Sequence, residues 1–124
     1  MTNAMQQHEL MAWLGPAASD LSAEQIERFA EEARIIAERY PDPDEQSERD
    51  AAMSAAVQYI LGETTPEDAH RALVDARRRE REAFAASAQI ATMLVADAGG
   101  KGKSQAARAV GIDRMSLLKA LGER

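Results

Sequence analysis

The sequence predicts an all-α protein: a small helical bundle with a long connecting helix and a C-terminal helix-turn-helix. Apolar residues make up 45% of the 124 residues but aromatic residues only 4%, and alanine is frequent. A chain rich in Ala, Glu and Arg and poor in β-branched residues favours helices. Apolar residues also recur at helical spacing, with Pro and Gly between the runs. No segment has the pattern of a strand.

The first predicted helix covers residues 3–14 and ends at Gly15-Pro16, because proline cannot continue a helix. Its small apolar face consists of Leu10, Trp13 and Leu14. A second helix is expected to begin at Ser22, whose hydroxyl can cap free amides while Gln25 reaches back, and to run to Tyr40. Its buried stripe is Ile26, Phe29, Ala30, Ala33, Ile36, Ala37 and Tyr40.

A third helix is predicted over residues 44–61, after the turn Pro41-Asp42-Pro43-Asp44. Gly62 is its expected end, because glycine tolerates the left-handed conformation that closes a helix. The side chains expected to pack inward are Ala52, Met53, Ala56, Val57, Ile60 and Leu61. Together these helices form a predicted acidic body, residues 1–65.

Thr65-Pro66-Glu67-Asp68 is a helix start signal, with Thr as the cap, Pro in the first turn and two acids near the positive end of the helix dipole. The helix that follows, residues 66–98, is expected to be about 50 Å long and to connect the two ends of the chain. One continuous apolar side is predicted for it, made of Leu73, Ala76, Ala83, Phe84, Ser87, Ile90, Ala91, Leu94 and Val95.

The run RRRERE, residues 77–82, lies in the middle of this helix. Arg and Glu pairing on neighbouring turns of a solvated helix is one interpretation. A second contact with a DNA backbone, or a seam of salt bridges between subunits, is the other.

Charge is unevenly distributed along the chain. Residues 1–65 carry 13 acidic and 4 basic side chains, residues 66–100 carry 6 and 5, and residues 101–124 carry 2 and 6, so these segments have net charges of −9, −1 and +4. The overall charge of −6 therefore conceals a basic segment on an acidic body.

The last segment, residues 99–124, has two short helical patterns separated by Gly111, which can adopt the positive φ that begins a tight turn. Ala107 is small enough for two helices to cross there, and Asp113 can cap the second helix. The expected inner, structural positions are Ala107, Val110, Gly111, Ile112, Leu117 and Leu121. These are the demands of a helix-turn-helix. A helical hairpin that only packs is the alternative, and the basic surplus argues against it.

The segment resembles the C-terminal helix-turn-helix of the Fis family and of the related enhancer-binding activators. The resemblance covers about 22 of the 124 residues, and the residues that match the family pattern are Lys103-Ser104-Gln105-Ala106-Ala107-Arg108, Gly111-Ile112, Arg114, Ser116-Leu117 and Leu121. Residues 1–65 show no such resemblance.

The resemblance implies that a second helix, about residues 114–121, enters the major groove of double-stranded DNA. Arg114 would read a guanine edge or contact a phosphate. Leu118 departs from the polar residue often found at its position, and would touch a thymine methyl group or be buried. The predicted DNA-binding residues are Lys101, Lys103, Ser104, Gln105, Arg108, Asp113, Arg114, Met115, Ser116, Leu118 and Lys119.

Other chemistry is not favoured. Gly102-Lys103-Ser104 ends like a phosphate-binding loop, but Asp97 stands where that motif needs glycine and a helix, not a strand, precedes it. Gly99-Gly100 is instead expected to end the long helix as a short hinge, with Ser104 as a cap or a phosphate contact. His8 and His70 lack metal-ligand spacing, and the acidic run from Asp42 to Asp50 lacks that of a calcium loop. We expect no cofactor, no metal, no nucleotide and no enzyme activity.

The sequence therefore predicts a DNA-binding transcriptional regulator of the cytoplasm and nucleoid, with no membrane span and no cysteine. A homodimer is expected, joined by the stripe of residues 69–98 together with the second and third helices. A protein-interaction adaptor, whose acidic body recruits a partner while DNA tethers it, and a nucleoid-associated protein of low specificity are the alternatives. The composition is typical of a GC-rich genome, and the size suits a phage or plasmid regulator.

Overall fold

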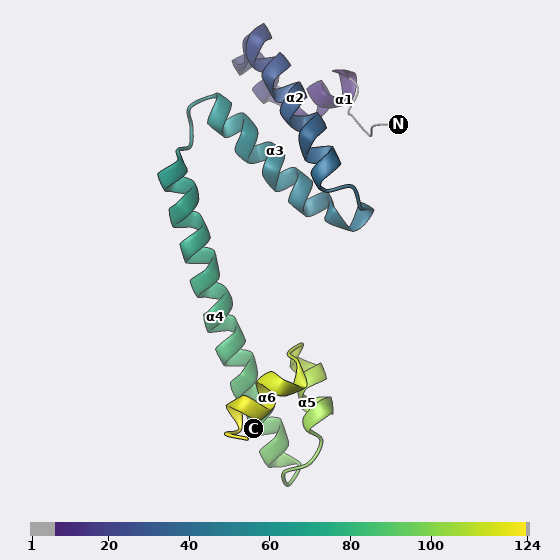
Figure 1. Cartoon of the computed structure of the whole chain (residues 1–124), viewed down its shortest axis with the longest axis vertical. Coiled ribbons are helices and arrows are strands. Elements are labelled where there is room, and N and C mark those ends of the chain that lie inside the picture. Colours follow the sequence, from purple (N-terminus) through teal and green to yellow (C-terminus); the bar gives the residue numbers. More distant parts are fainter. Residues whose placement is uncertain (1–6, 124) are drawn as a thin grey trace. The chain divides into compact units, whose positions relative to one another are not determined.

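The computed structural model describes residues 7–123, and all of their regular secondary structure is helical (Figure 1). It comprises six α-helices and two short 3-10 helices, with no strand in this range. The predicted all-α class is therefore confirmed. The chain forms two compact units, Met1–Ala69 and His70–Arg124, called here the N-terminal and the C-terminal unit.

The N-terminal unit contains three α-helices, α1 (Gln7–Leu14), α2 (Ala23–Arg39) and α3 (Gln46–Ile60). The 3-10 helices η1 (Gly15–Asp20) and η2 (Pro43–Glu45) precede α2 and α3 respectively. Figure 1 shows α2 and α3 side by side, joined by a short turn.

The predicted boundaries need two corrections. Gly15-Pro16 ends α1 at Leu14, but helical structure continues as η1, because proline is accepted in the first turn of a new helix. The third helix begins at Gln46 and not at residue 44, since Asp42 and Glu45 first form a capping box around η2. Residues 3–6 of the first predicted helix lie outside the described residues.

The core of the N-terminal unit is built around Phe29, which is fully buried. The Trp13 ring packs against it, with 5.6 Å between ring centroids. The other buried members, from α1 to α3, are Leu10, Leu14, Leu21, Ala33, Ile36 and Met53. Every residue of the predicted inner stripes except Ala37 belongs to this core, and Ile26, Ala30, Val57 and Ile60 are among its half-buried members.

Local signals read from the sequence are confirmed at the start of α2, after α3 and at the start of the long helix. The Ser22 amide donates to Gln25 Oε1 at 2.8 Å and the Gln25 amide donates to Ser22 Oγ at 3.2 Å, as the predicted capping box requires. Gly62 has φ +74° after α3, and the Asp68 amide donates to Thr65 Oγ1 at 3.1 Å as the long helix begins.

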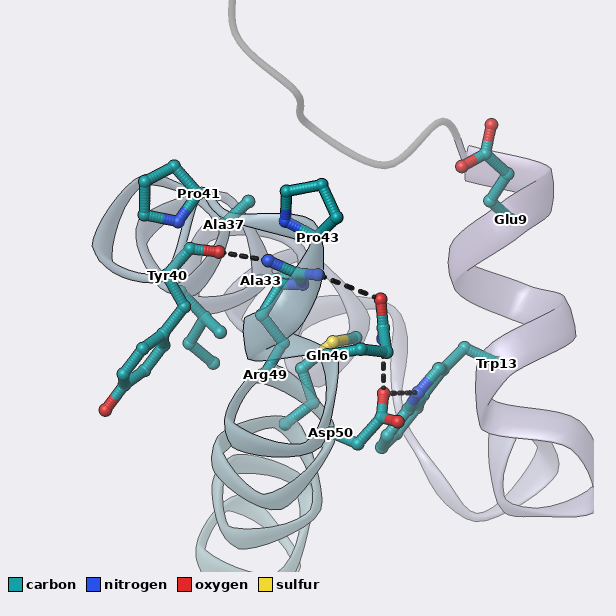
Figure 2. Close-up of a pocket in the computed structure, with 12 residues that line it drawn as sticks. Glu9, Trp13, Ala33, Ala37, Tyr40, Pro41, Pro43, Gln46, Arg49 and Asp50 are labelled. Carbon is teal, nitrogen blue, oxygen red and sulfur yellow. Dashed lines mark hydrogen bonds between the residues drawn. The ribbon is translucent and has the colours of Figure 1, made fainter.

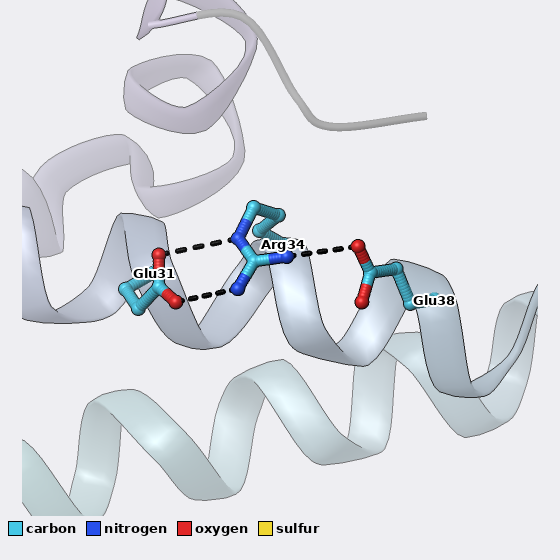
Figure 3. Close-up of polar contacts among 3 residues, drawn as sticks. All are labelled: Glu31, Arg34 and Glu38. Carbon is cyan, nitrogen blue, oxygen red and sulfur yellow. Dashed lines mark hydrogen bonds and ion pairs between the residues drawn. The ribbon is translucent and has the colours of Figure 1, made fainter. Parts of the chain in front are cut away.

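Charged side chains cover the outer face of α2. Figure 3 shows Arg34 between Glu31 and Glu38, with the closest N···O distances 2.6 Å and 2.8 Å. These hydrogen bonds and charges raise the pKa of Arg34 above its ordinary value, and the bond from Arg34 lowers the pKa of Glu31. Because all three groups are exposed, the cluster contributes little to stability.

The C-terminal unit contains most of α4 (Pro66–Asp97), with α5 (Lys103–Val110) and α6 (Arg114–Ala120). The first four residues of α4 belong to the N-terminal unit. Within α4, Ala88, Ala91 and Val95 are buried, whereas residues 66–86 are exposed apart from the half-buried Asp75. The predicted apolar side of this helix is therefore covered only near its C-terminal end.

Candidate nucleic-acid interface

The candidate site is the pair of short helices α5 and α6, packed on the end of α4. Gly99 and Gly100 end α4 with φ values of +71° and +87°, and the Gly100 amide donates to the Val95 carbonyl at 2.9 Å. The predicted end of the long helix is therefore confirmed, and the hinge at these glycines stays a prediction. The segment before the Gly-Lys-Ser triplet is helical, as the argument against a phosphate-binding loop requires.

The core of this site is a small cluster drawn from all three helices. Leu117 of α6 and Ala91 of α4 are fully buried, and Ala107 of α5 is 2% exposed. Val95 and Ala106 complete the buried set, with Val110, Ile112 and Leu121 packed against it. The predicted inner positions thus meet α4, and alanines at the crossing allow the helices to approach closely.

The turn between α5 and α6 has the backbone geometry predicted for Gly111. Its φ of +79° lies in the left-handed region, which glycine enters without the cost that a Cβ imposes. The Ile112 amide then donates to the Ala107 carbonyl at 3.0 Å, which satisfies a carbonyl at the end of α5.

Asp113 caps α6 as predicted. Its Oδ1 accepts a hydrogen bond from the Ser116 amide and its Oδ2 accepts one from the Ser116 hydroxyl, both at 2.8 Å. These bonds lower the pKa of Asp113 below its ordinary value of 3.8. Both residues are among the predicted DNA contacts, but in the structure their side chains bind each other and fix the start of α6.

The outward face of α6 presents Met115 and Lys119. Positions 115 and 119 are one turn apart and lie on the side of the helix opposite Leu117. Met115 is 65% exposed, and Lys119 is also exposed. Arg114 is exposed on the flank of the same helix, beside the half-buried Leu118. Neither Arg114 nor Lys119 forms an ion pair within residues 7–123, so both cations are available to an external anion.

The first helix of the pair, α5, also has a buried side and an exposed side. Ser104 and Arg108, also one turn apart, are both exposed on α5, and each lies about 200° around the helix from the buried Ala106. Gln105 and the preceding Lys101 are exposed as well. Of the two roles predicted for Ser104, that of the α5 cap is wrong, because the helix begins at Lys103 and Gly102 occupies the cap position.

Lys103, a predicted phosphate contact, has an ion partner within its own unit. Its ammonium group pairs with the Glu123 carboxylate at 2.8 and 2.9 Å, and its side chain is 28% exposed. The reason lies in the helical register, since residue 103 shares a face with Ala106, Ala107 and Val110. Glu123 was not among the predicted site residues, and this shared face was the signal that could have indicated an internal role for Lys103.

The two units carry opposite net charges. Residues 1–69 contain 15 acidic and 4 basic side chains, a net charge of −11, whereas residues 70–124 contain 6 acidic and 11 basic side chains, a net charge of +5. The excess of positive charge therefore lies on the unit that contains α5 and α6, where it raises the local concentration of anions.

The RRRERE run contributes to that excess. Arg78 lies 3.4 Å from Asp75 and 3.8 Å from Glu82, both weak surface pairs. Arg77, Arg79 and Arg81 form no ion pair with any residue that the structure describes. Ion pairing among residues 7–123 thus accounts for one of the four arginines, Arg78.

Other kinds of site find no support among the described residues. No three His, Cys, Asp or Glu side chains in residues 7–123 come together as a metal site would require. The predicted acidic run is used locally, since Glu45 accepts from the Asp42 amide and Asp50 accepts from Gln46. Over the same range, none of the helices has both the length and the apolar character needed to cross a membrane.

Comparisons of the chain with known protein families, with curated protein sequences and with solved structures gave no match.

Replacement of Ala107 by Leu should destabilise the C-terminal unit by about 1–3 kcal/mol, because the added atoms have no space between the three helices. Ala109→Leu is the matched control, since Ala109 is on the same helix but exposed. Chemical denaturation of both variants, followed by circular dichroism, measures the difference. Equal stability of the two variants would contradict the close helix crossing.

The stability of the C-terminal unit should depend on pH through Asp113. Because folding lowers the pKa of this carboxyl, its contribution is complete above about pH 3.8 and is lost as the pH falls through the folded value. Asp113→Asn keeps a capping oxygen but cannot titrate, so its thermal unfolding should change less between neutral and acidic pH. An NMR titration that places the Asp113 pKa at or above 3.8 would disprove this.

Proposed function

We propose that the chain is a dimeric transcriptional regulator that binds double-stranded DNA sequence-specifically. The observation that carries this proposal is the α5–α6 pair, in which a capped helix presents Arg114 and Lys119 without ion partners among residues 7–123. The net charge of +5 on the same unit supports it. The resemblance of residues 101–124 to the Fis-family helix-turn-helix points to the same function.

In this proposal α6 enters the major groove. Met115 and Lys119 face the bases or the groove walls, and Arg114 at the start of the helix reaches a guanine edge or a flanking phosphate. Ser104, Gln105, Arg108 and Lys101 contact phosphates around α5. Lys103 keeps its pairing with Glu123, so its contribution is to hold the ends of the two helices together.

Dimer formation is the second part of the proposal. One helix-turn-helix makes few base contacts, and two of them, bound to half-sites about one helical turn apart, supply useful affinity. The exposed part of α4 offers the surface, since Leu73, Phe84, Ile90 and Leu94 are between 41% and 52% exposed. A solitary helix is marginal in water, so a second copy of α4 would stabilise this stretch.

A second candidate function is an adaptor whose N-terminal unit recruits a protein. The net charge of −11 on that unit favours it, because such a surface attracts basic partners and repels DNA. A nucleoid-associated protein of low specificity is distinguished from both by equal competition from unrelated DNA. No part of these proposals requires catalysis or a cofactor.

Loss of Arg114 and Lys119 together should abolish DNA binding without loss of helical content. Arg114→Ala alone should weaken binding roughly tenfold or more, because a forked donor to a base or phosphate is removed. Arg39→Ala is the control, since it makes the same charge change on the exposed surface of the N-terminal unit. Gel-shift titrations on DNA chosen from a randomised pool measure the affinities, and unchanged binding by the double variant would refute the site.

The full chain should sediment as a dimer at micromolar concentration. Phe84→Glu should shift it toward the monomer, since a carboxylate would be placed in the apolar seam of α4. Ala85→Glu adds the same charge at the next position, turned about 100° around the helix, and should leave the dimer intact. A strict monomer for the unchanged chain would remove the dimer from the proposal.

A further inference from the structure

The N-terminal unit contains a pocket of about 400 Å³ that the proposed function does not use (Figure 2). It lies between α1, the end of α2 and the start of α3. Trp13 lines one side, and Tyr40, Pro41 and Pro43 line the side formed by the turn between α2 and α3. Its apolar floor includes the buried Met53.

A carboxylate is held at the side of this pocket. Asp50 Oδ1 accepts hydrogen bonds from the Trp13 indole nitrogen at 3.5 Å and from Gln46 Nε2 at 2.9 Å, as Figure 2 shows. Asp50 Oδ2 accepts none from the residues that the structure describes. The Asp50 side chain is therefore oriented by its neighbours and keeps one oxygen for a ligand.

The basic residue beside the pocket does not neutralise this carboxylate. Arg49 donates through Nη1 to the backbone carbonyls of Tyr40 and Asp42, and through Nη2 to Gln46 Oε1 at 3.1 Å. The guanidinium thus fixes the turn between α2 and α3. Gln46 links Arg49 to Asp50 and so keeps the two charged groups apart.

The pocket combines the features that recognise an arginine side chain. A flat guanidinium can stack on an indole or phenol ring, and its forked donors match a carboxylate, while its stem needs apolar walls. Trp13 supplies the ring and Asp50 supplies the acceptor, and Glu9, one turn before Trp13, also lines the pocket. The surrounding unit, with a net charge of −11, attracts a cationic partner.

We propose that this pocket binds an arginine side chain in a basic peptide segment of a partner protein. The guanidinium donates to Asp50 Oδ2 and lies against the Trp13 ring, and the apolar neighbours of the arginine contact the wall at Pro41 and Pro43. This binding is independent of DNA recognition by the C-terminal unit, so either proposal can fail without the other.

Two peptides test the proposal on the full chain. One is fluorescein-labelled Gly-Leu-Arg-Leu amide, and the other carries citrulline, which has the shape of arginine without its charge. Anisotropy titrations should show binding of the arginine peptide and roughly tenfold or weaker affinity for the citrulline peptide, because a charge-assisted hydrogen bond is lost. Unlabelled arginine peptide should also change the emission of Trp13, which is the single tryptophan of the chain.

Matched variants locate the binding. Asp50→Asn should reduce affinity for the arginine peptide roughly tenfold or more. Asp20→Asn makes the same charge change at an exposed position that does not line this pocket, and should bind normally. Circular dichroism checks that both variants fold. If Asp50→Asn does not fold, the citrulline comparison on the unchanged chain still tests the proposal.

Three results would overturn the proposal. They are absence of binding by the arginine peptide at millimolar concentration, equal binding of the citrulline peptide, and equal losses in the two variants. The last would mean that the peptide is attracted to the acidic surface in general. Gel shifts on the same variants should show unchanged DNA affinity, which separates this test from that of the proposed function.

Discussion

The burial of Leu117 against Ala91 and Ala107 is the contact on which the C-terminal unit depends. The buried cluster around this contact is small, and three short-range constraints bring the helices to this point: the glycines after α4, the left-handed turn at Gly111 and the cap at Asp113. Once position 117 faces inward, helical periodicity decides which residues of α6 face outward. The exposure of Met115 and Lys119 is thus a consequence of packing on the opposite side.

Features determined by neighbouring residues could be predicted from the sequence. The Ser22 capping box, the Thr65 cap, the Gly62 and Gly111 turns and the Asp113 cap each depend on residues three or four apart, and each is present. The predicted inner positions of α5 and α6 also reach a common core. Their spacing alone indicates which side of each helix is apolar.

Features that depend on residues far apart in the sequence were missed. Lys103 and Glu123 are 20 residues apart, and their pairing needs α6 to return past the start of α5. The pocket beside Trp13 likewise needs Asp50, which is 37 residues away. The apolar side predicted for α4 rests on a residue pattern, and a pattern does not say which part the chain itself covers. Only the positions around Ala91 and Val95 are buried.

The separation of charge between the units changes what the bulk properties of the chain mean. The isoelectric point of about 4.9 and the net charge of −6 are properties of the whole chain, and neither unit has that net charge. A polyanion that approaches α5 and α6 meets a unit of charge +5, and a polycation that approaches α2 meets one of charge −11. The chain is a polyampholyte in two blocks, so it can adsorb to ion-exchange surfaces of either sign at one pH.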